Sequence, residues 1–281
     1  MGTPHRPFSL PRAGIDLLVT AGPAVEDAGG SKAMHSGPED LVRAARRAGV
    51  SDERVLTALR ATPREAFAPL EDRRAVYDDA PLWIGHGQVT TQPSLSALML
   101  EGLALVGDEH VLEVGTGAGF QTALLAALAG DVVSIEWWAD LSEQAGRVLD
   151  AEGVGNVELV VGDGSRGVPE RAPYDAVLVS AAALEVPAAL VEQLRPGGRL
   201  VQPIGPGGDE QVVLFERAGS GLRRIDVLVL ARFVPMRSRD QQRGLRGGGG
   251  GFWFCMTPTE KNTPRPPPPR GSWWGIKSAF N

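Results

Sequence analysis

The sequence predicts an α/β protein with a doubly wound, mostly parallel sheet of seven strands, preceded by an N-terminal helical cap. The first observation behind this prediction is the alternation of short apolar strands and helical segments over residues 110–230. Such alternation implies parallel strands joined by right-handed crossovers. The second is a glycine-rich turn, GTGAG at 115–119, which follows the first strand and opens a helix. The third is the short connection between the last two strands, which predicts an antiparallel final strand.

The N-terminal part of the chain shows helical patterns and one long loop. Residues 40–50 and 51–67 have the apolar spacing of helices, and Ser51 is a suitable N-cap for the second of them. Residues 78–93 contain several Gly and Pro and predict a loop or an irregular hairpin. A helix is then expected over 93–105, with a proline in its first turn.

Seven apolar segments predict the strands of the sheet. They cover 110–114, 131–136, 156–161, 174–180, 198–204, 211–215 and 225–230. Helical segments between the earlier strands cover 121–130, 141–153 and 186–198. The domain boundaries that follow are 1–33 for a disordered extension, 34–105 for the N-terminal helices and loop, 106–236 for the α/β core, and 237–281 for a flexible tail with glycine and proline runs.

Composition and charge argue against several classes of protein. The chain is 43% hydrophobic and 22% charged, which is typical of globular proteins, and no apolar run reaches the roughly 20 residues that cross a bilayer. The single cysteine, Cys255, and four histidines offer no framework for disulfides or a metal site. The first 236 residues carry 20 Lys and Arg against 32 Asp and Glu, so nucleic acid is not an expected partner. We expect a cytoplasmic monomer without membrane contact.

Acidic residues at the carboxyl ends of two strands accompany the glycine-rich turn. Gly115, Gly117 and Gly119 let a ligand approach the main chain and the helix N-terminus. Glu136 ends the second strand and can accept hydrogen bonds from ribose hydroxyls, and Asp163 after the third strand can accept one from an adenine amino group. Each alone has an ordinary interpretation, as a turn glycine, a solvated acid or a turn-forming Asp. Because acids would repel a pyrophosphate, the combination predicts a pocket for the sulfonium cofactor S-adenosylmethionine.

Longer strings of residues identify a family. Residues 55–236 resemble the protein-L-isoaspartate (D-aspartate) O-methyltransferase family through the strings TPREAFAP, IGHGQ, EVGTGAGFQTALLA and RFVP. Generic methyltransferases share only the glycine turn and the acid after it, whereas IGHGQ and RFVP are typical of this family. The resemblance implies a Rossmann-like methyltransferase fold, a substrate loop within 34–105, and isoaspartyl-containing peptides and proteins as partners. It also implies repair, in which methylation of L-isoaspartyl or D-aspartyl carboxylates in damaged proteins leads through a succinimide to aspartate.

The resemblance also assigns roles to individual residues. Where the family has an active-site serine, this sequence has Thr91, which keeps the hydroxyl and is the predicted catalytic residue; the alternative is an N-cap for the helix at 93. His86 is interpreted as a loop histidine, and Trp137 and Trp138 either cover the adenine or pack under a helix. The residues predicted to contact the cofactor are Glu113, Gly115, Gly117, Ala118, Gly119, Glu136, Asp163, Gly164, Val89, Thr90, Ser96 and Gln242.

The predicted reaction needs alignment rather than a strong base. A substrate carboxylate, with an ordinary pKa near ~3.9, is already ionised at neutral pH. Three alternatives stay open. One is a peptide-specific aspartate O-methyltransferase in modified-peptide biosynthesis, which the unusual tail suggests. Another is a non-catalytic adenosyl-binding module. The third is a nicotinamide-dependent dehydrogenase, which the G-x-G-x-G spacing disfavours.

Overall fold

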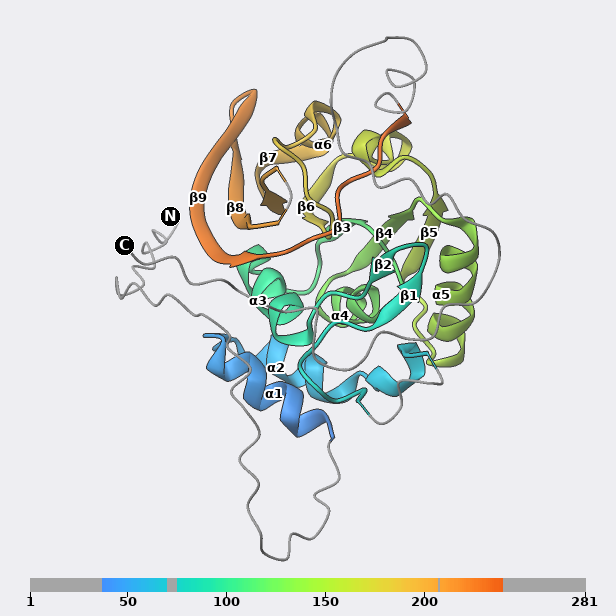
Figure 1. The fold of residues 1–281 in the computed structure, drawn as a ribbon. Helices are drawn as coiled ribbons and strands as arrows, with labels where there is room; N and C mark the ends of the chain where they lie inside the picture. The colour runs from blue at the N-terminus through green and yellow to red at the C-terminus, as the bar shows by residue number, and fades with distance from the viewer. Residues whose placement is uncertain (1–36, 70–74, 207, 240–281) are drawn as a thin grey trace, which may run out of the picture. The chain divides into compact units, whose positions relative to one another are not determined.

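The structure is a computed structural model that describes residues 37–69, 75–206 and 208–239 (Figure 1). The predicted extension over 1–33, Gln242, Cys255 and all of the predicted tail beyond Arg239 lie outside these residues. Among the helices that the structure describes, none is long and apolar enough to cross a membrane.

All seven predicted strands are present and form one sheet. They are β3 (His110–Val114), β4 (Asp131–Glu136), β5 (Val157–Val161), β6 (Tyr174–Val179), β7 (Leu194–Ile204), β8 (Glu210–Ala218) and β9 (Gly221–Ala231). Their order is β5-β4-β3-β6-β7-β8-β9, and the first five in this order are parallel. The last two strands pair antiparallel, as predicted. The strand that runs against the others is β8, because β7 and β8 are also antiparallel and β9 returns to the common direction.

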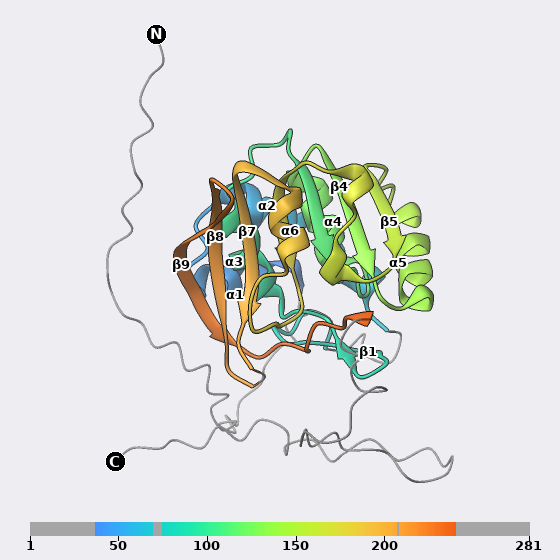
Figure 2. The same ribbon diagram turned by 90° about the horizontal axis from the view of Figure 1, so that it is seen from above.

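Helices cover both faces of the sheet (Figures 1 and 2). The helices are α1 (Pro38–Arg47), α2 (Glu53–Ala61), α3 (Pro93–Leu103), α4 (Phe120–Leu128), α5 (Ala139–Ala151) and α6 (Ala188–Gln193). Alternation along β3 separates the two cores. Val111 packs in the cluster that includes α1 to α4, whereas Leu112 and Val114 belong to the cluster on the α6 face. Glu113 lies on the same face of β3 as Val111 and therefore faces α4.

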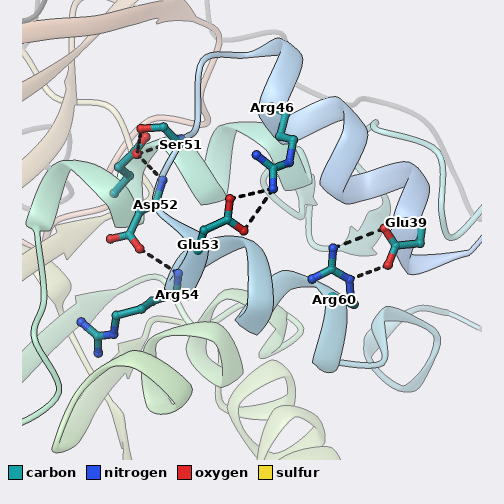
Figure 3. A network of polar contacts seen from close by, with 8 residues as sticks. Glu39, Arg46, Ser51, Asp52, Glu53, Arg54 and Arg60 are labelled. Atoms are coloured by element: carbon teal, nitrogen blue, oxygen red, sulfur yellow. Dashed lines mark hydrogen bonds and ion pairs between the residues drawn. The ribbon is translucent and has the colours of Figure 1, made fainter.

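Ion pairs join α1 to α2 on the surface (Figure 3). Arg46 donates to both carboxylate oxygens of Glu53, at 2.7 and 3.0 Å, and Arg60 pairs with Glu39. These side chains are exposed, and solvent screens such pairs, so they contribute little to stability. Packing of apolar residues such as Leu56, which is 0% exposed, therefore holds the two helices together.

Two details of α2 differ from the sequence prediction. The N-cap is Asp52, whose Oδ1 accepts from the Arg54 N–H at 2.8 Å. Ser51 instead donates through both its N–H and its hydroxyl to Oε1 of Glu101 on α3, each at 2.9 Å. The predicted helix over 51–67 breaks at Pro63, because proline disfavours helical dihedrals in the residue before it. The chain resumes as the short 3₁₀ helix η1 (Arg64–Phe67).

A buried arginine fixes the start of the long loop that leads to α3. Arg64 is 1% exposed and donates to the carbonyls of Val76, Asp78 and Ala80 at 2.7 to 2.8 Å. Burial lowers its pKa to about 10, so the guanidinium stays charged at neutral pH. Three charge-assisted hydrogen bonds hold this short segment against η1. Asp79, within the segment, accepts from the N–H of Ser94 in the first turn of α3.

Candidate active site

A pocket lies at the carboxyl ends of the central strands. Its lining combines the turn after β3, the end of β4, the residues after β6, the loop before α3 and the segment after β9. Ten of the predicted site residues line it, and they are Val89, Thr90, Thr91, Ser96, Gly115, Gly117, Ala118, Gly119, Glu136 and Gly164. One cavity therefore contains residues from both the predicted N-terminal region, 34–105, and the predicted α/β core, 106–236.

Positive φ angles explain the glycines of the turn after β3. Gly115, Gly117 and Gly119 have φ of 100°, 54° and 91°, a region that other residues adopt only with strain. A Cβ on Gly117 would also lie 3.2 Å from Cδ1 of Ile84, in the loop that covers the turn. The open main chain at this point therefore depends on glycine for both conformation and space.

Glu136 is held at the end of β4 with both oxygens facing main-chain donors. It is 6% exposed, and its two oxygens accept from the N–H of Gly117 and of Trp138, each at 3.0 Å. Each carboxylate oxygen can accept a second hydrogen bond. The side chain therefore fixes the glycine turn and still has acceptor capacity for two neighbouring hydroxyls of a ligand.

Asp163 lies beside the pocket, with both carboxylate oxygens hydrogen-bonded within the chain. It is buried at 6% exposure and does not line the pocket, although the adjacent Gly164 does. Its Oδ1 accepts from the N–H and hydroxyl of Ser165, and its Oδ2 accepts from the N–H of Arg239 at 2.8 Å. Asp163 thus anchors the segment after β9, and its predicted contact with an adenine stays a prediction.

Glu113 lies beneath the pocket rather than in its lining. It is 0% exposed and accepts from the hydroxyls of Thr122 at 2.5 Å and Ser134 at 2.7 Å. It also accepts from Nε2 of Gln121 at 3.2 Å, and Gln121 itself lines the pocket. Glu113 is linked to the pocket lining through Gln121 and, by way of Ser134, through Thr116. Its predicted contact with the cofactor stays a prediction.

Replacing Glu113 with glutamine should remove part of the pH dependence of folding stability. Burial raises the pKa of Glu113 to about 7 from an ordinary 4.5, despite the opposing hydrogen bonds. The native state keeps the Glu113 proton up to a higher pH than the unfolded state does. The protonated side chain therefore stabilises the native state fully below the unfolded pKa, and this stabilisation is lost as pH rises towards the native pKa. The loss is on the order of 3 kcal/mol between about pH 4.5 and about pH 7.

The measurement is the free energy of unfolding in urea, taken at several pH values for both proteins. We expect the wild type to lose stability across this window more steeply than Glu113→Gln. Equal slopes for the two proteins would contradict the raised pKa of the buried Glu113.

Thr91 is not the N-cap of α3, so that interpretation is wrong. The N-cap is Gln92, and the first-turn N–H of Ser94 is satisfied by Oδ1 of Asp79 at 2.9 Å. Asp79 also accepts from the side-chain amide of Gln92 at 2.8 Å. Within the described residues the Thr91 hydroxyl has no hydrogen-bond partner, and the residue lines the pocket.

A two-stranded hairpin, β1 (Trp83–Gly85) and β2 (Gln88–Val89), lies at the end of the sheet to which the parallel strands point (Figure 2). His86 at its tip stacks on Trp138 with centroids 4.0 Å apart, and its Nε2 lies 2.7 Å from Oδ2 of Asp140. This hydrogen bond lowers the pKa of Asp140. His86 is indeed a loop histidine, as predicted, and it fastens the hairpin to the N-terminus of α5.

The segment after β9 closes the pocket from the other side. It hydrogen-bonds to Ala182 through Val234 and Met236, at 2.8 and 2.7 Å, before it reaches Asp163. The guanidinium of Arg237 lies 4.9 Å from the centroid of the Trp138 ring, within the range of a cation–π contact. Trp138 and its neighbour Trp137 both line the pocket, so neither is confined to packing under a helix.

Several lining residues were not predicted from the sequence. Ile84, Gln121, Ser180 and Arg237 all line the pocket, although Ile84 and Gln121 lie within the family strings IGHGQ and EVGTGAGFQTALLA. A further signal for Gln121 was its place two residues after the glycine turn, at the start of α4. Ser180 follows β6 directly, where the carboxyl end of a strand beside the glycine turn is a common ligand position.

The polar groups of the pocket fit S-adenosylmethionine. Within the described residues, three buried side-chain atoms in its lining have no partner: Ser96 Oγ, Gln121 Oε1 and Trp138 Nε1. An unpaired buried polar group is unfavourable by about 1–3 kcal/mol, so such atoms indicate a polar ligand or water. Together with Glu136 they offer acceptors for hydroxyl and ammonium groups and donors for a carboxylate, the groups that this cofactor carries.

Comparison with known proteins agrees with this geometry. The family model for protein-L-isoaspartate(D-aspartate) O-methyltransferase matches residues 36–241. The protein-L-isoaspartate O-methyltransferase of Myxococcus xanthus is 45% identical over 201 residues, which are 70% of this chain and 95% of that protein. The enzyme of the same name from Opitutus terrae is 43% identical over 230 residues, 80% of this chain and 97% of that protein.

Solved structures show the same fold. A protein-L-isoaspartate O-methyltransferase structure matches with a TM-score of 0.64 and 31% identity, over 74% of this chain and 70% of that chain. A Plasmodium falciparum structure in complex with S-adenosyl-L-homocysteine matches with a TM-score of 0.62 and 20% identity, over 72% of this chain and 98% of that chain. The second match shows likeness of fold alone.

Proposed function

Because this chain belongs to the protein-L-isoaspartate(D-aspartate) O-methyltransferase family, we propose that its pocket binds S-adenosylmethionine and that Thr91 presents the substrate carboxylate to it. The enzyme methylates the free carboxylate of L-isoaspartyl residues, and of D-aspartyl residues, in damaged proteins. The observation that carries the proposal is the convergence of Thr91, the glycine turn and Glu136 on one pocket. The residue roles rest on this geometry.

S-adenosylmethionine supplies a methyl group on a positively charged sulfur, which is a good electrophile. The chain has to hold the acceptor carboxylate in line with that methyl group and keep water away from the path. Thr91, whose hydroxyl has no other partner among the residues that the structure describes, donates a hydrogen bond to the carboxylate. Such alignment contributes up to roughly 7–11 kcal/mol to a reaction of this kind. A general base is not needed, because an aspartyl carboxylate is already ionised near neutral pH.

Glu136 and the glycine turn hold the nucleoside half of the cofactor in this proposal. Glu136 accepts from the ribose hydroxyls, with its own position fixed by the N–H groups of Gly117 and Trp138. The hairpin that His86 fastens to Asp140 covers the reacting groups. Exclusion of water strengthens the hydrogen bond from Thr91, because competing solvent is removed.

The test uses a synthetic isoaspartyl peptide and its aspartyl twin, each incubated with the full-length chain and S-adenosylmethionine. Mass spectrometry should show a single added methyl group on the isoaspartyl peptide only. Methylation of unrelated isoaspartyl peptides by the same sample would argue for repair. Methylation of the aspartyl twin instead would overturn the proposal and favour a peptide-specific aspartate O-methyltransferase. The monomeric state and the cytoplasmic location stay predictions, the first of which size-exclusion chromatography with light scattering checks.

A further inference from the structure

Gln121 combines deep burial with an amide oxygen that no group of the described chain satisfies. The residue is 7% exposed and lines the pocket, and its Oε1 has no hydrogen-bond partner within the described residues. Buried amide oxygens are nearly always paired in folded proteins. The position therefore calls for a donor that arrives with a ligand.

The orientation of the Gln121 amide is fixed by two acceptors on its nitrogen side. Nε2 donates to Oε1 of Glu113 at 3.2 Å and to the hydroxyl of Ser180 at 2.6 Å. With its nitrogen engaged by these two acceptors, the amide turns its oxygen away from Glu113 and Ser180. Glu113 is in turn held by Thr122 and Ser134. The amide oxygen is thereby preset as an acceptor.

The order of the strands places Gln121 near one particular half of the cofactor. Glu136 ends β4 and Ser180 follows β6, and these strands flank β3 on opposite sides. With the nucleoside half at Glu136 and Gly164, the remainder of the molecule extends over β3 towards β6. A Cβ on Gly115 would lie only 3.5 Å from the Cβ of Ser180, which shows how near the glycine turn is to β6.

Another lining oxygen without a partner in the described residues, Oγ of Ser96, can donate a hydrogen bond where Oε1 of Gln121 can only accept one. Ser96 is 1% exposed, lines the pocket, and its hydroxyl has no partner within the described residues. A hydroxyl can donate to a carboxylate, whereas the Gln121 oxygen can only accept. An acceptor and a donor left unpaired in one pocket match the two ends of an α-amino acid, its ammonium and its carboxylate.

We infer that Gln121 is the acceptor for the α-ammonium group of the cofactor's amino-acid half, and that Glu113 and Ser180 are positioning residues that aim its amide oxygen. The inference rests on the proposed function, since it concerns the same cofactor.

Two ligands that differ only in the amino-acid half distinguish a role of Gln121 in recognition from a structural role. S-adenosylhomocysteine carries the amino-acid half, and 5′-methylthioadenosine has the same nucleoside without it. Calorimetry on the full chain should show that Gln121→Met weakens S-adenosylhomocysteine about 10- to 100-fold, the range expected for a lost hydrogen bond to a charged group. The affinity for 5′-methylthioadenosine should change by about twofold or less, because that ligand has no group for Gln121 to contact.

A second variant and a control complete the design. Ser180→Ala, which removes one of the two groups that orient the amide, should show the same ligand dependence with a smaller loss, and it serves if Gln121→Met does not fold. Gln88→Met alters another lining glutamine, whose Nε2 donates to the carbonyl of His86, and should leave the ratio of the two affinities unchanged.

The outcomes are distinguishable from one another. An equal loss for both ligands in Gln121→Met would show a structural role and overturn the inference, as would unchanged binding of S-adenosylhomocysteine. A wild-type chain that binds neither ligand would overturn the proposed cofactor site itself, and the inference with it.

Discussion

Thr91→Ala should lower the single-turnover rate of methyl transfer about 100-fold, while the affinity for S-adenosylmethionine changes by about twofold or less. The reason is that Thr91 acts on the acceptor carboxylate, and misplacement of a reacting group by about 1 Å is enough for such a loss. Thr91→Ser keeps the hydroxyl and should preserve activity. Rapid-quench measurement of methyl ester formation, with calorimetry on the same samples, gives both quantities.

The structure supplies a sharp control for this experiment. Asp79, and not Thr91, satisfies the first turn of α3, so Thr91→Ala should leave the melting temperature nearly unchanged. Asp79→Ala should instead lower stability by about 1 kcal/mol through loss of the cap. A Thr91→Ala protein that is destabilised but fully active would show that the hydroxyl has a structural role after all.

Glu136→Ala should weaken S-adenosylmethionine about 10- to 100-fold, because it removes charge-assisted hydrogen bonds of roughly 1.5–3 kcal/mol. The same change releases the N–H of Gly117 and of Trp138, so the glycine turn also loses its support. Affinity is measured by calorimetry, with the melting temperature followed on each sample.

The matched control is at the other end of the same strand. Asp131 begins β4 and forms an exposed pair with His110, outside the pocket lining. Asp131→Ala should leave cofactor affinity unchanged. If Glu136→Ala also binds the cofactor as the wild type does, the assignment of the pocket is wrong.

The core of the fold followed from local patterns. All seven strands, β3 to β9, were predicted from the sequence, although β7, β8 and β9 are longer than predicted. Local sequence predicts them because a buried strand needs a continuous apolar run whatever surrounds it. The glycine turn was also predictable, since only glycine adopts φ near 100° without strain, as Gly115 does. Thr91 and Glu136 both line the pocket, because each stands at an element end that a doubly wound sheet brings together.

Contacts between distant segments were decided by tertiary structure alone. The cap of α3 comes from Asp79, 15 residues before Ser94, and the hairpin tip at His86 is fastened 54 residues away at Asp140. Sequence spacing favours the nearest capping side chain, so Thr91 was considered for α3 and Ser51 was assigned to α2. A backbone N–H is satisfied by whichever acceptor the folded chain brings within reach, and local sequence does not determine that acceptor.

Tertiary packing also decides why Gln121 lines the pocket and Glu113 does not. Their motif places both beside the glycine turn, but strand alternation turns Glu113 towards α4 and away from the pocket. Only when β3, α4 and β6 pack together does Gln121 bond to both Glu113 and Ser180. Its oxygen then faces the pocket without a partner in the described part of the chain. Hydrogen bonds depend on distance and direction, and both arise from packing that a linear pattern of residues does not contain.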